Sequence, residues 1–139
     1  MKKEILIFSI IFFLGCLAGF EPTKEPQENY LGRTLALGFE RIKIPSWSFD
    51  NNGEFFLEFR NYRGREVRIS AVKIIMDNVT ATVFPDVQLF ESSGFEYTFR
   101  GLPIKEKGSN YWAYVDITYQ ELIERKTEHE TGNLCGVIK

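Results

Sequence analysis

The segment 109–121, SNYWAYVDITYQE, constrains the fold more than any other part of the chain. Its residues alternate between the two sides of an extended backbone, and aromatic and β-branched residues are frequent on both sides. One side would carry Tyr111, Ala113, Val115, Ile117 and Tyr119. Alternation with a period of two is typical of a half-buried β-strand rather than of a helix. We therefore expect one long strand at the centre of an antiparallel sheet.

The chain from residue 34 onward divides into short alternating runs separated by turn residues. In the run 53–60, Phe55, Leu57 and Phe59 would face the core, and Glu58 and Arg60 would face solvent. In the run 78–84, residues 79, 81 and 83 would face inward. The other expected strands are 34–44, 66–76, 87–90, 95–100 and 133–139, with a short edge piece at 47–49 and a polar excursion or hairpin at 121–131.

Two local signals refine these boundaries. Pro45 should end the first strand, because proline has no N–H to donate to a ladder. The apolar phase slips near Ala71 and Val72, which indicates a β-bulge, one extra residue within a strand. The number of short strands and the spacing of the turns predict an all-β fold. We expect an antiparallel two-sheet, Ig-like β-sandwich preceded by an N-terminal hydrophobic helix and a short tether.

The first twenty residues have the pattern of an export signal. Lys2 and Lys3 precede an apolar run from Ile5 to Leu14, and Gly15-Cys16 follows. The residues 13–16, FLGC, resemble the lipobox of secreted lipoproteins, which predicts lipidation of Cys16. The alternatives are an uncleaved anchor over 5–20, which is shorter than the roughly 20 residues that span a bilayer, and simple cleavage. Each alternative places the rest of the chain across a cell membrane, on its extracytoplasmic side.

Composition divides the chain into three parts and excludes some partners. Residues 1–20 form the signal or anchor segment, residues 21–31 a polar tether with nothing to bury, and residues 32–139 the β-sandwich domain. The hydrophobic content of 44% is enough for one core. The net charge of −2, without a cluster of Lys or Arg, argues against a nucleic-acid partner.

The sequence offers few residues that could carry chemistry. His129 lies between two glutamates without further ligands at metal-binding spacing, so we expect a solvated loop and no metal site. Cys135 is expected to be a buried free thiol. The aspartates at 50, 77, 86 and 116 have no spacing that brings them together, so no catalytic residue and no cofactor are predicted.

One further residue is a candidate for modification, and two are candidates for binding. Asn78-Val79-Thr80 is a glycosylation sequon, which an exported chain could use at Asn78. Trp112 and Tyr114 share the second side of the long strand and would form an aromatic binding face if that side is exposed. The alternative is that both residues pack beneath the polar segment 121–131 or inside a sandwich.

The order of these segments resembles a known group of proteins. A Trp-bearing strand leads into SFDNNGEFFLEFRNYRGREVRISAVKI, then YWAYVDITYQE, then HETGNLCGVIK. This order is similar to the extracellular β-sandwich domains of archaeal type IV pilin-like and related surface proteins. Pilins of that kind have a charged-residue-Gly cleavage site and a longer hydrophobic helix, which this chain lacks.

The expected function follows from these observations. We expect a non-enzymatic, membrane-tethered β-sandwich with a structural or partner-binding role at the cell envelope. Its partners would be the membrane, through the N-terminal segment, and other envelope proteins or like subunits. The alternatives are a pilin-like filament subunit and an envelope enzyme or solute-binding module.

Overall fold

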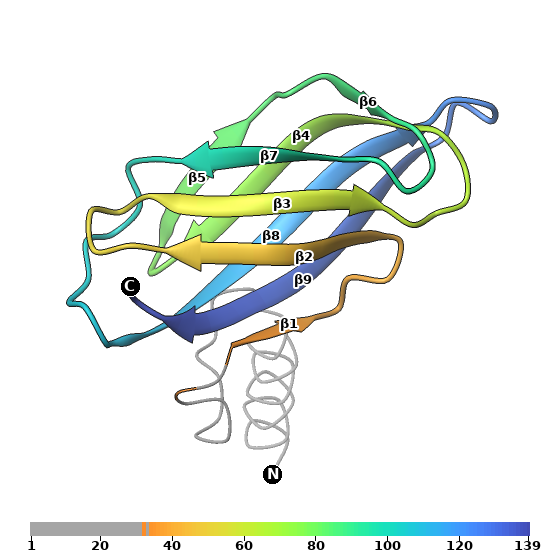
Figure 1. Ribbon diagram of the computed structural model, residues 1–139. Coiled ribbons are helices and arrows are strands. Elements are labelled where there is room, and N and C mark those ends of the chain that lie inside the picture. Colours follow the sequence, from red (N-terminus) through yellow and green to blue (C-terminus); the bar gives the residue numbers. More distant parts are fainter. Residues whose placement is uncertain (1–31, 33) are drawn as a thin grey trace, which may run out of the picture.

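The computed structural model describes residue 32 and residues 34–139, and in this part the chain forms β-strands and no helix (Figure 1). The predicted segments 1–20 and 21–31, with Cys16, lie outside the described residues. The nine strands are β1 (Leu35–Leu37), β2 (Ile42–Phe49), β3 (Phe55–Asn61), β4 (Val67–Met76), β5 (Val79–Val83), β6 (Val87–Leu89), β7 (Gly94–Phe99), β8 (Asn110–Glu121) and β9 (Thr127–Val137).

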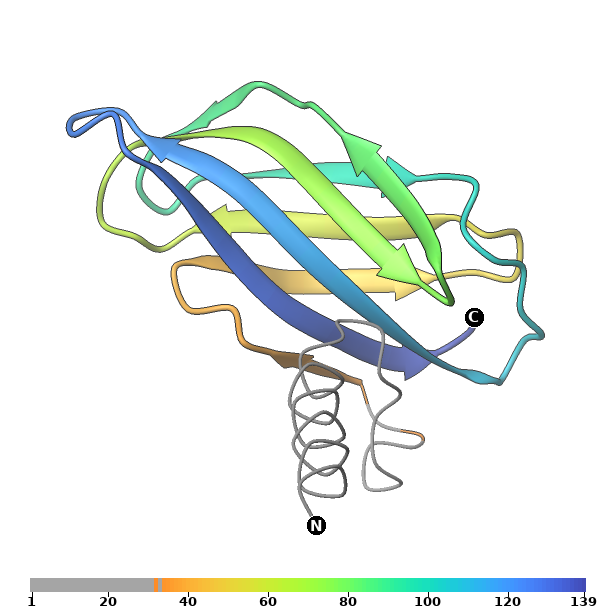
Figure 2. The same cartoon turned by 180° about the vertical axis from the view of Figure 1, so that it is seen from behind.

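The strands form two antiparallel sheets that lie one over the other. The larger sheet has six strands in the order β1-β9-β8-β4-β5, with β6 also paired to β4. The smaller sheet has three strands in the order β2-β3-β7. Figure 2 shows the larger sheet in front of the smaller one. The chain passes from one sheet to the other after β1, β3, β6 and β7, so the hydrophobic core is enclosed by segments far apart in sequence.

The long strand predicted at 109–121 is confirmed as β8, and it lies between β9 and β4. Its odd-numbered residues face the smaller sheet, and Val115, Ile117 and Tyr119 are fully buried there. Across the core, Phe55, Leu57 and Phe59 of β3 are also fully buried. The predicted register of β3 is therefore confirmed, with Glu58 and Arg60 on the outer side, partly covered and paired at 2.9 Å.

The predicted first strand, 34–44, is wrong in its extent. Residues 35–37 form β1 at one edge of the larger sheet, whereas residues 42–49 form β2 in the smaller sheet. Pro45 does not end β2. The pairing of β2 with β3 shifts register between Lys43 and Ser46, and β2 is an edge strand. A proline is tolerated at an edge or bulge because no neighbour needs its missing N–H.

The predicted bulge in the fourth strand is confirmed. The register of β4 against β8 shifts between Ile69 and Ala71. The extra residue keeps Ile69 and Val72 on the same side, and both are fully buried. An irregularity that breaks the alternation in sequence therefore preserves a continuous core-facing surface in space.

The closing strand begins earlier than residue 133. The polar segment 121–131 contains a hairpin, and β9 already pairs with β8 from Thr127, opposite Gln120. Polar residues extend this strand because the neighbouring β8 offers a complete ladder of hydrogen-bonding groups. Periodicity alone missed this half of β9 because its core-facing positions include Glu130 and Gly132, which are not apolar.

The fifth strand is less buried than predicted. Val79 is exposed, and Ala81 and Val83 are only half-buried. The smaller sheet has three strands against six, so it does not cover the whole inner surface of the larger sheet.

Candidate functional site

Asn78 lies at the tip of the β4–β5 hairpin. Asp77 and Asn78 are its two turn residues, with φ of 48° and 65°, and Met76 pairs with Val79. Positive φ at both central positions is the type I′ geometry, in which Asn is favoured. Asn78 is exposed. The preference of asparagine for this turn is enough to explain why it occupies position 78, with or without glycosylation. Its exposure leaves the side chain accessible to modification.

Trp112 and Tyr114 lie on the outer side of the larger sheet, as the alternation of β8 requires. Both are half-buried, not fully exposed. Trp112 pairs with Cys135 and Tyr114 with Asn133 of β9, and Tyr114 also faces Ile75 of β4. The two rings therefore share one surface but do not form an open aromatic platform on the described residues.

His129 and Asp116 are neighbours on β9 and β8, on the same outer surface. The distance from His129 Nδ1 to Asp116 Oδ1 is 3.0 Å, and Thr118 Oγ1 is 3.3 Å from the same nitrogen. Within residues 32 and 34–139, no group of three or more His, Cys, Asp or Glu side chains is placed to hold a metal ion. Asp50 instead accepts the N–H groups of Asn52 and Glu54 in the β2–β3 turn.

Cys135 is a buried free thiol, as predicted, with 2% of its surface exposed. Its Sγ lies 3.6 Å from the carbonyl oxygen of Leu35, across the β1–β9 pair. Burial raises the pKa of this thiol. A protonated, inaccessible thiol is a poor nucleophile, so the environment favours a packing role.

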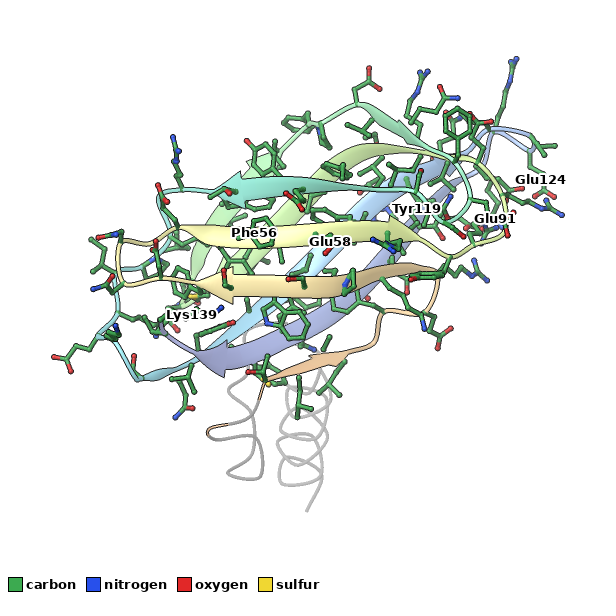
Figure 3. The ribbon with its side chains drawn as sticks, viewed as in Figure 1. Phe56, Glu58, Glu91, Tyr119, Glu124 and Lys139 are labelled. Atoms are coloured by element: carbon green, nitrogen blue, oxygen red, sulfur yellow. The ribbon has the colours of Figure 1, made fainter. Side chains whose placement is uncertain are left out.

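One end of the molecule holds a charged cluster that was not predicted from the sequence. We call the residues Arg41, Arg63, Arg65, Glu121 and Glu128 the Arg–Glu cluster. Arg41 precedes β2, Arg63 and Arg65 lie between β3 and β4, Glu121 ends β8 and Glu128 belongs to β9. Figure 3 shows Tyr119 and Glu124 at this same end. The cluster therefore joins three connections that come from different parts of the sequence.

Glu121 is the buried centre of this cluster, with 1% of its side chain exposed. Its Oε2 accepts from Arg63 Nη2 at 2.7 Å, and its Oε1 accepts from Arg65 Nη1 at 2.5 Å. Two charge-assisted hydrogen bonds offset the cost of removing a carboxylate from water. Hydrogen bonding by Arg65 and Arg63 holds the pKa of Glu121 below its ordinary value.

Glu128 extends the same network toward the surface. Its Oε2 accepts from the Tyr119 hydroxyl at 2.8 Å and lies 3.1 Å from Arg41 Nη1 and 3.0 Å from Arg63 Nη1. The Tyr119 hydroxyl and then the nearby arginines lower the pKa of Glu128. Burial, followed by the hydrogen bond to Glu128, raises the pKa of Tyr119.

An open hollow of about 430 Å³ lies over the cluster, and its walls come from Arg41, Tyr62, Arg63, Arg65 and Glu124. The chemistry of this hollow does not suit general acid–base catalysis. A carboxylic acid that donates protons near neutral pH needs a raised pKa, whereas Glu121 and Glu128 have lowered ones. Each guanidinium already faces a glutamate. The ion pairs instead hold the three connections together, which is a structural role.

Asn61 anchors the same end from inside. It is fully buried at the end of β3. Its Nδ2 donates to the carbonyl of Arg65 at 2.7 Å and to that of Leu89 at 3.2 Å, and its Oδ1 accepts from the N–H of Arg63 at 2.9 Å. One side chain thus fixes the β3–β4 connection against the end of β6.

A second surface lies along one side of the molecule, where β5 and β7 are the outer strands of the two sheets. We call this surface the lateral edge. Residues 81–83 and 97–100 line a hollow of about 290 Å³ between the two strands. Val79, Tyr97 and Phe84, which directly follows β5, expose 38%, 37% and 76% of their surfaces. Exposed apolar side chains on or next to an edge strand are typical of an interaction surface.

Part of the charged end was accessible to sequence reasoning. Continuing the alternation of β8 from Tyr111 through Tyr119 places Glu121 on the buried side, and continuing β3 does the same for Asn61. A buried carboxylate requires cationic partners. The identity of those partners, Arg63 and Arg65, depends on the path of the β3–β4 connection and could not be read from periodicity.

Comparison of the chain with models of known protein families and with curated proteins gives no match. Among the residues that the structure describes, no helix is long and apolar enough to cross a membrane.

Proposed function

We propose that this chain is an exported, membrane-tethered, non-enzymatic protein whose Ig-like β-sandwich binds a protein partner at the outer face of the cell membrane. The observation that carries the binding role is the lateral edge, where the edge strands of both sheets and exposed apolar side chains occur together. A structural domain with no partner would gain solubility by covering or charging this edge.

The export and tether parts of the proposal rest on the sequence. Lys2-Lys3, the apolar run 5–14 and Gly15-Cys16 have the order of a lipoprotein signal, and residues 21–31 are a polar spacer. A lipid on Cys16 would hold the domain by burying its chains in the membrane, at about 0.8 kcal/mol per CH₂. The resemblance to archaeal pilin-like surface proteins supports the same location, at the outer face of the cell membrane.

The Ig-like assignment rests on how the strands are connected. Hairpins join β2 to β3, β4 to β5 and β8 to β9, and the chain changes sheets after β1, after β3, after β6 and after β7. Connections of this kind between two packed antiparallel sheets are typical of Greek-key sandwiches such as the Ig fold. In such folds the sheets supply a rigid frame, and the exposed edges and loops make contact with partners.

Limited proteolysis of intact cells that produce the full chain tests the location. Protease added outside should cleave within 21–31 and release a resistant fragment that contains the two sheets. Cys16→Ser should release the domain into the medium or leave an uncleaved precursor, whereas Cys135→Ala, which removes the other thiol, should do neither. Full protection of the chain in intact cells would overturn the proposal, because it would place the domain inside.

The same cells distinguish the pilin-like alternative. Electron microscopy should show no filaments that depend on this chain. Filaments that disappear when the gene is deleted would favour a filament subunit over a tethered binding domain.

A further inference from the structure

The two edges of the smaller sheet differ in how they are protected. At one edge, β2 contains Pro45 and a register shift after the exposed Lys43. Prolines, lysines and bulges are the devices that keep an edge strand from pairing with another chain. At the other edge, β7 reads GFEYTF, pairs with β3 without a register shift, and contains neither proline nor lysine. Among the described residues β7 pairs with β3 alone, so the backbone groups on its second side have no strand partner, and a hollow separates that side from residues 81–83 of β5.

The side chains of β7 divide between the two sides of the sheet. Phe95 stacks on Phe59 with the ring centroids 4.8 Å apart, and Phe99 is buried in the core. Glu96 and Thr98 lie on the outer side and are exposed, and Arg100 continues this side just beyond the strand. Glu96 makes no ion pair with the described residues. Arg100 Nε lies 3.1 Å from Glu54 Oε1, in a pair that is largely in solvent and therefore weak.

We propose that a second copy of this chain docks on the lateral edge, with β7 of each copy antiparallel about Thr98. This inference names the partner of the proposed binding role and rests on that proposal. Charge complementarity selects the second copy and the register. A twofold axis at Thr98 places Glu96 opposite Arg100 of the other copy, twice, with Tyr97 opposite Phe99 and Thr98 opposite itself. Opposite charges and threonine pairs are each favourable across antiparallel strands.

Symmetric registers centred on Glu96 or Tyr97 are worse. An axis at Glu96 would place two glutamates directly opposite each other, and like charges in that position are destabilising. An axis at Tyr97 would place Glu96 opposite Thr98 and leave Arg100 opposite Gly94. The Thr98 register merges the two smaller sheets into one and brings the exposed Tyr97 of each copy beside the other copy. The contact is isologous and closed, so it produces a dimer and not a filament.

Disulfide cross-linking of the full chain in the membranes of producing cells tests the register. Thr98→Cys should give a covalent dimer on mild oxidation, because the two thiols would face each other at the axis. Ser46→Cys is the matched control: Ser46 is exposed on β2 and lies in the same cross-strand row as Glu58 and Glu96, at the protected edge. The natural chain, with Cys16 and the buried Cys135, sets the background. Equal dimer yields at 98 and 46 would overturn the proposal.

Charge exchange in the Thr98→Cys chain tests the complementarity. Glu96→Arg or Arg100→Glu alone should lower the dimer yield about tenfold, since two attractive pairs become repulsive. Glu96→Arg combined with Arg100→Glu should restore it. Glu54→Gln removes the pair with Arg100 inside one copy and should leave the yield unchanged. Failure of the double variant to restore the dimer would refute the register.

The proteolysis result separates the two proposals. A chain that is cleaved from outside intact cells but gives no dimer at residue 98 retains the proposed envelope role and excludes this partner. A chain that is fully protected inside the cell loses the proposed function whatever its cross-linking yield.

Discussion

Phe59→Ala, compared with Phe56→Ala, is the sharpest test of the two-sheet core. Both residues are phenylalanines on β3, three positions apart and on opposite sides of the sheet. Phe59 is fully buried and stacks on Phe95 at an interplanar angle of 14°. Phe56 is half-buried on the outer side, where Figure 3 labels it. The two substitutions remove the same atoms from different environments.

The expected losses follow from burial. Removing a core phenylalanine costs about 3–5 kcal/mol in transfer and cavity terms, and the lost ring pair adds to it. We expect about 4 kcal/mol for Phe59→Ala, a large part of a total stability on the order of 5–15 kcal/mol. Phe56→Ala removes only a partly covered surface ring and should cost about 1 kcal/mol or less.

Urea unfolding of the segment 30–139, followed by tryptophan fluorescence, measures both losses. This segment should fold alone because the polar tether offers no apolar surface to the core. With a slope of about 1.5 kcal/mol per M for a domain of this size, Phe59→Ala should lower the unfolding midpoint by about 2–3 M and leave the slope unchanged. Equal losses for the two variants, or a larger loss for Phe56→Ala, would refute the assignment of the core side of β3.

Three further predictions concern titration and modification. Arg65 and Arg63 lower the folded-state pKa of Glu121, so the stability from this pairing is present above the unfolded pKa of about 4.3 and is lost as pH falls through the folded value. The difference in urea midpoint between the natural chain and Glu121→Gln should therefore be widest near pH 7 and shrink in acid. A difference that does not change with pH would contradict the pairing. Burial raises the pKa of Tyr111 to about 12, so the contribution of the neutral phenol to stability is complete below the unfolded pKa of about 10 and is lost as pH rises toward 12. Ultraviolet titration should show a late phenolate step that Tyr111→Phe removes. If the step persists in the variant, it belongs to another tyrosine. If Asn78 is glycosylated, the intact mass of the natural chain should exceed the polypeptide mass, Thr80→Ala should remove the excess, and Thr80→Ser, which keeps the sequon, should retain it. A natural chain with the mass of the bare polypeptide would rule the modification out.

Short-range patterns were sufficient to locate most strands. The alternation of β8 and β3 reflects side chains that point to opposite sides of each strand, which is a property of the local backbone. The bulge in β4 was visible for the same reason, since an extra residue shifts the phase of Ile69 and Val72. The turn at Asp77 and Asn78 also depends on a few adjacent residues, although the alternation placed Asn78 within a strand. Each of these features needs only neighbours along the chain.

The features that were missed depend on neighbours in space. Pro45 continues β2 only because that strand lies at an edge, and sheet order is not encoded by any single strand. The first half of β9 is a strand because β8 lies beside it, although its own residues are polar. These features could not be predicted from local residues because the hydrogen-bonding groups along the edge of a strand must pair with another strand, and the fold decides which strand lies there.

The Arg–Glu cluster and the lateral edge also depend on neighbours in space. The partners of Glu121 lie 58 and 56 residues away in sequence, and they reach it only when the β3–β4 connection crosses the end of β8. The lateral edge exists because both sheets are open, so that among the described residues β7 and β5 each pair with one strand only. Periodicity specifies which side of a strand is apolar, because that is decided within a few residues. Which apolar side remains open to a partner is decided by how many strands the packed sheets contain.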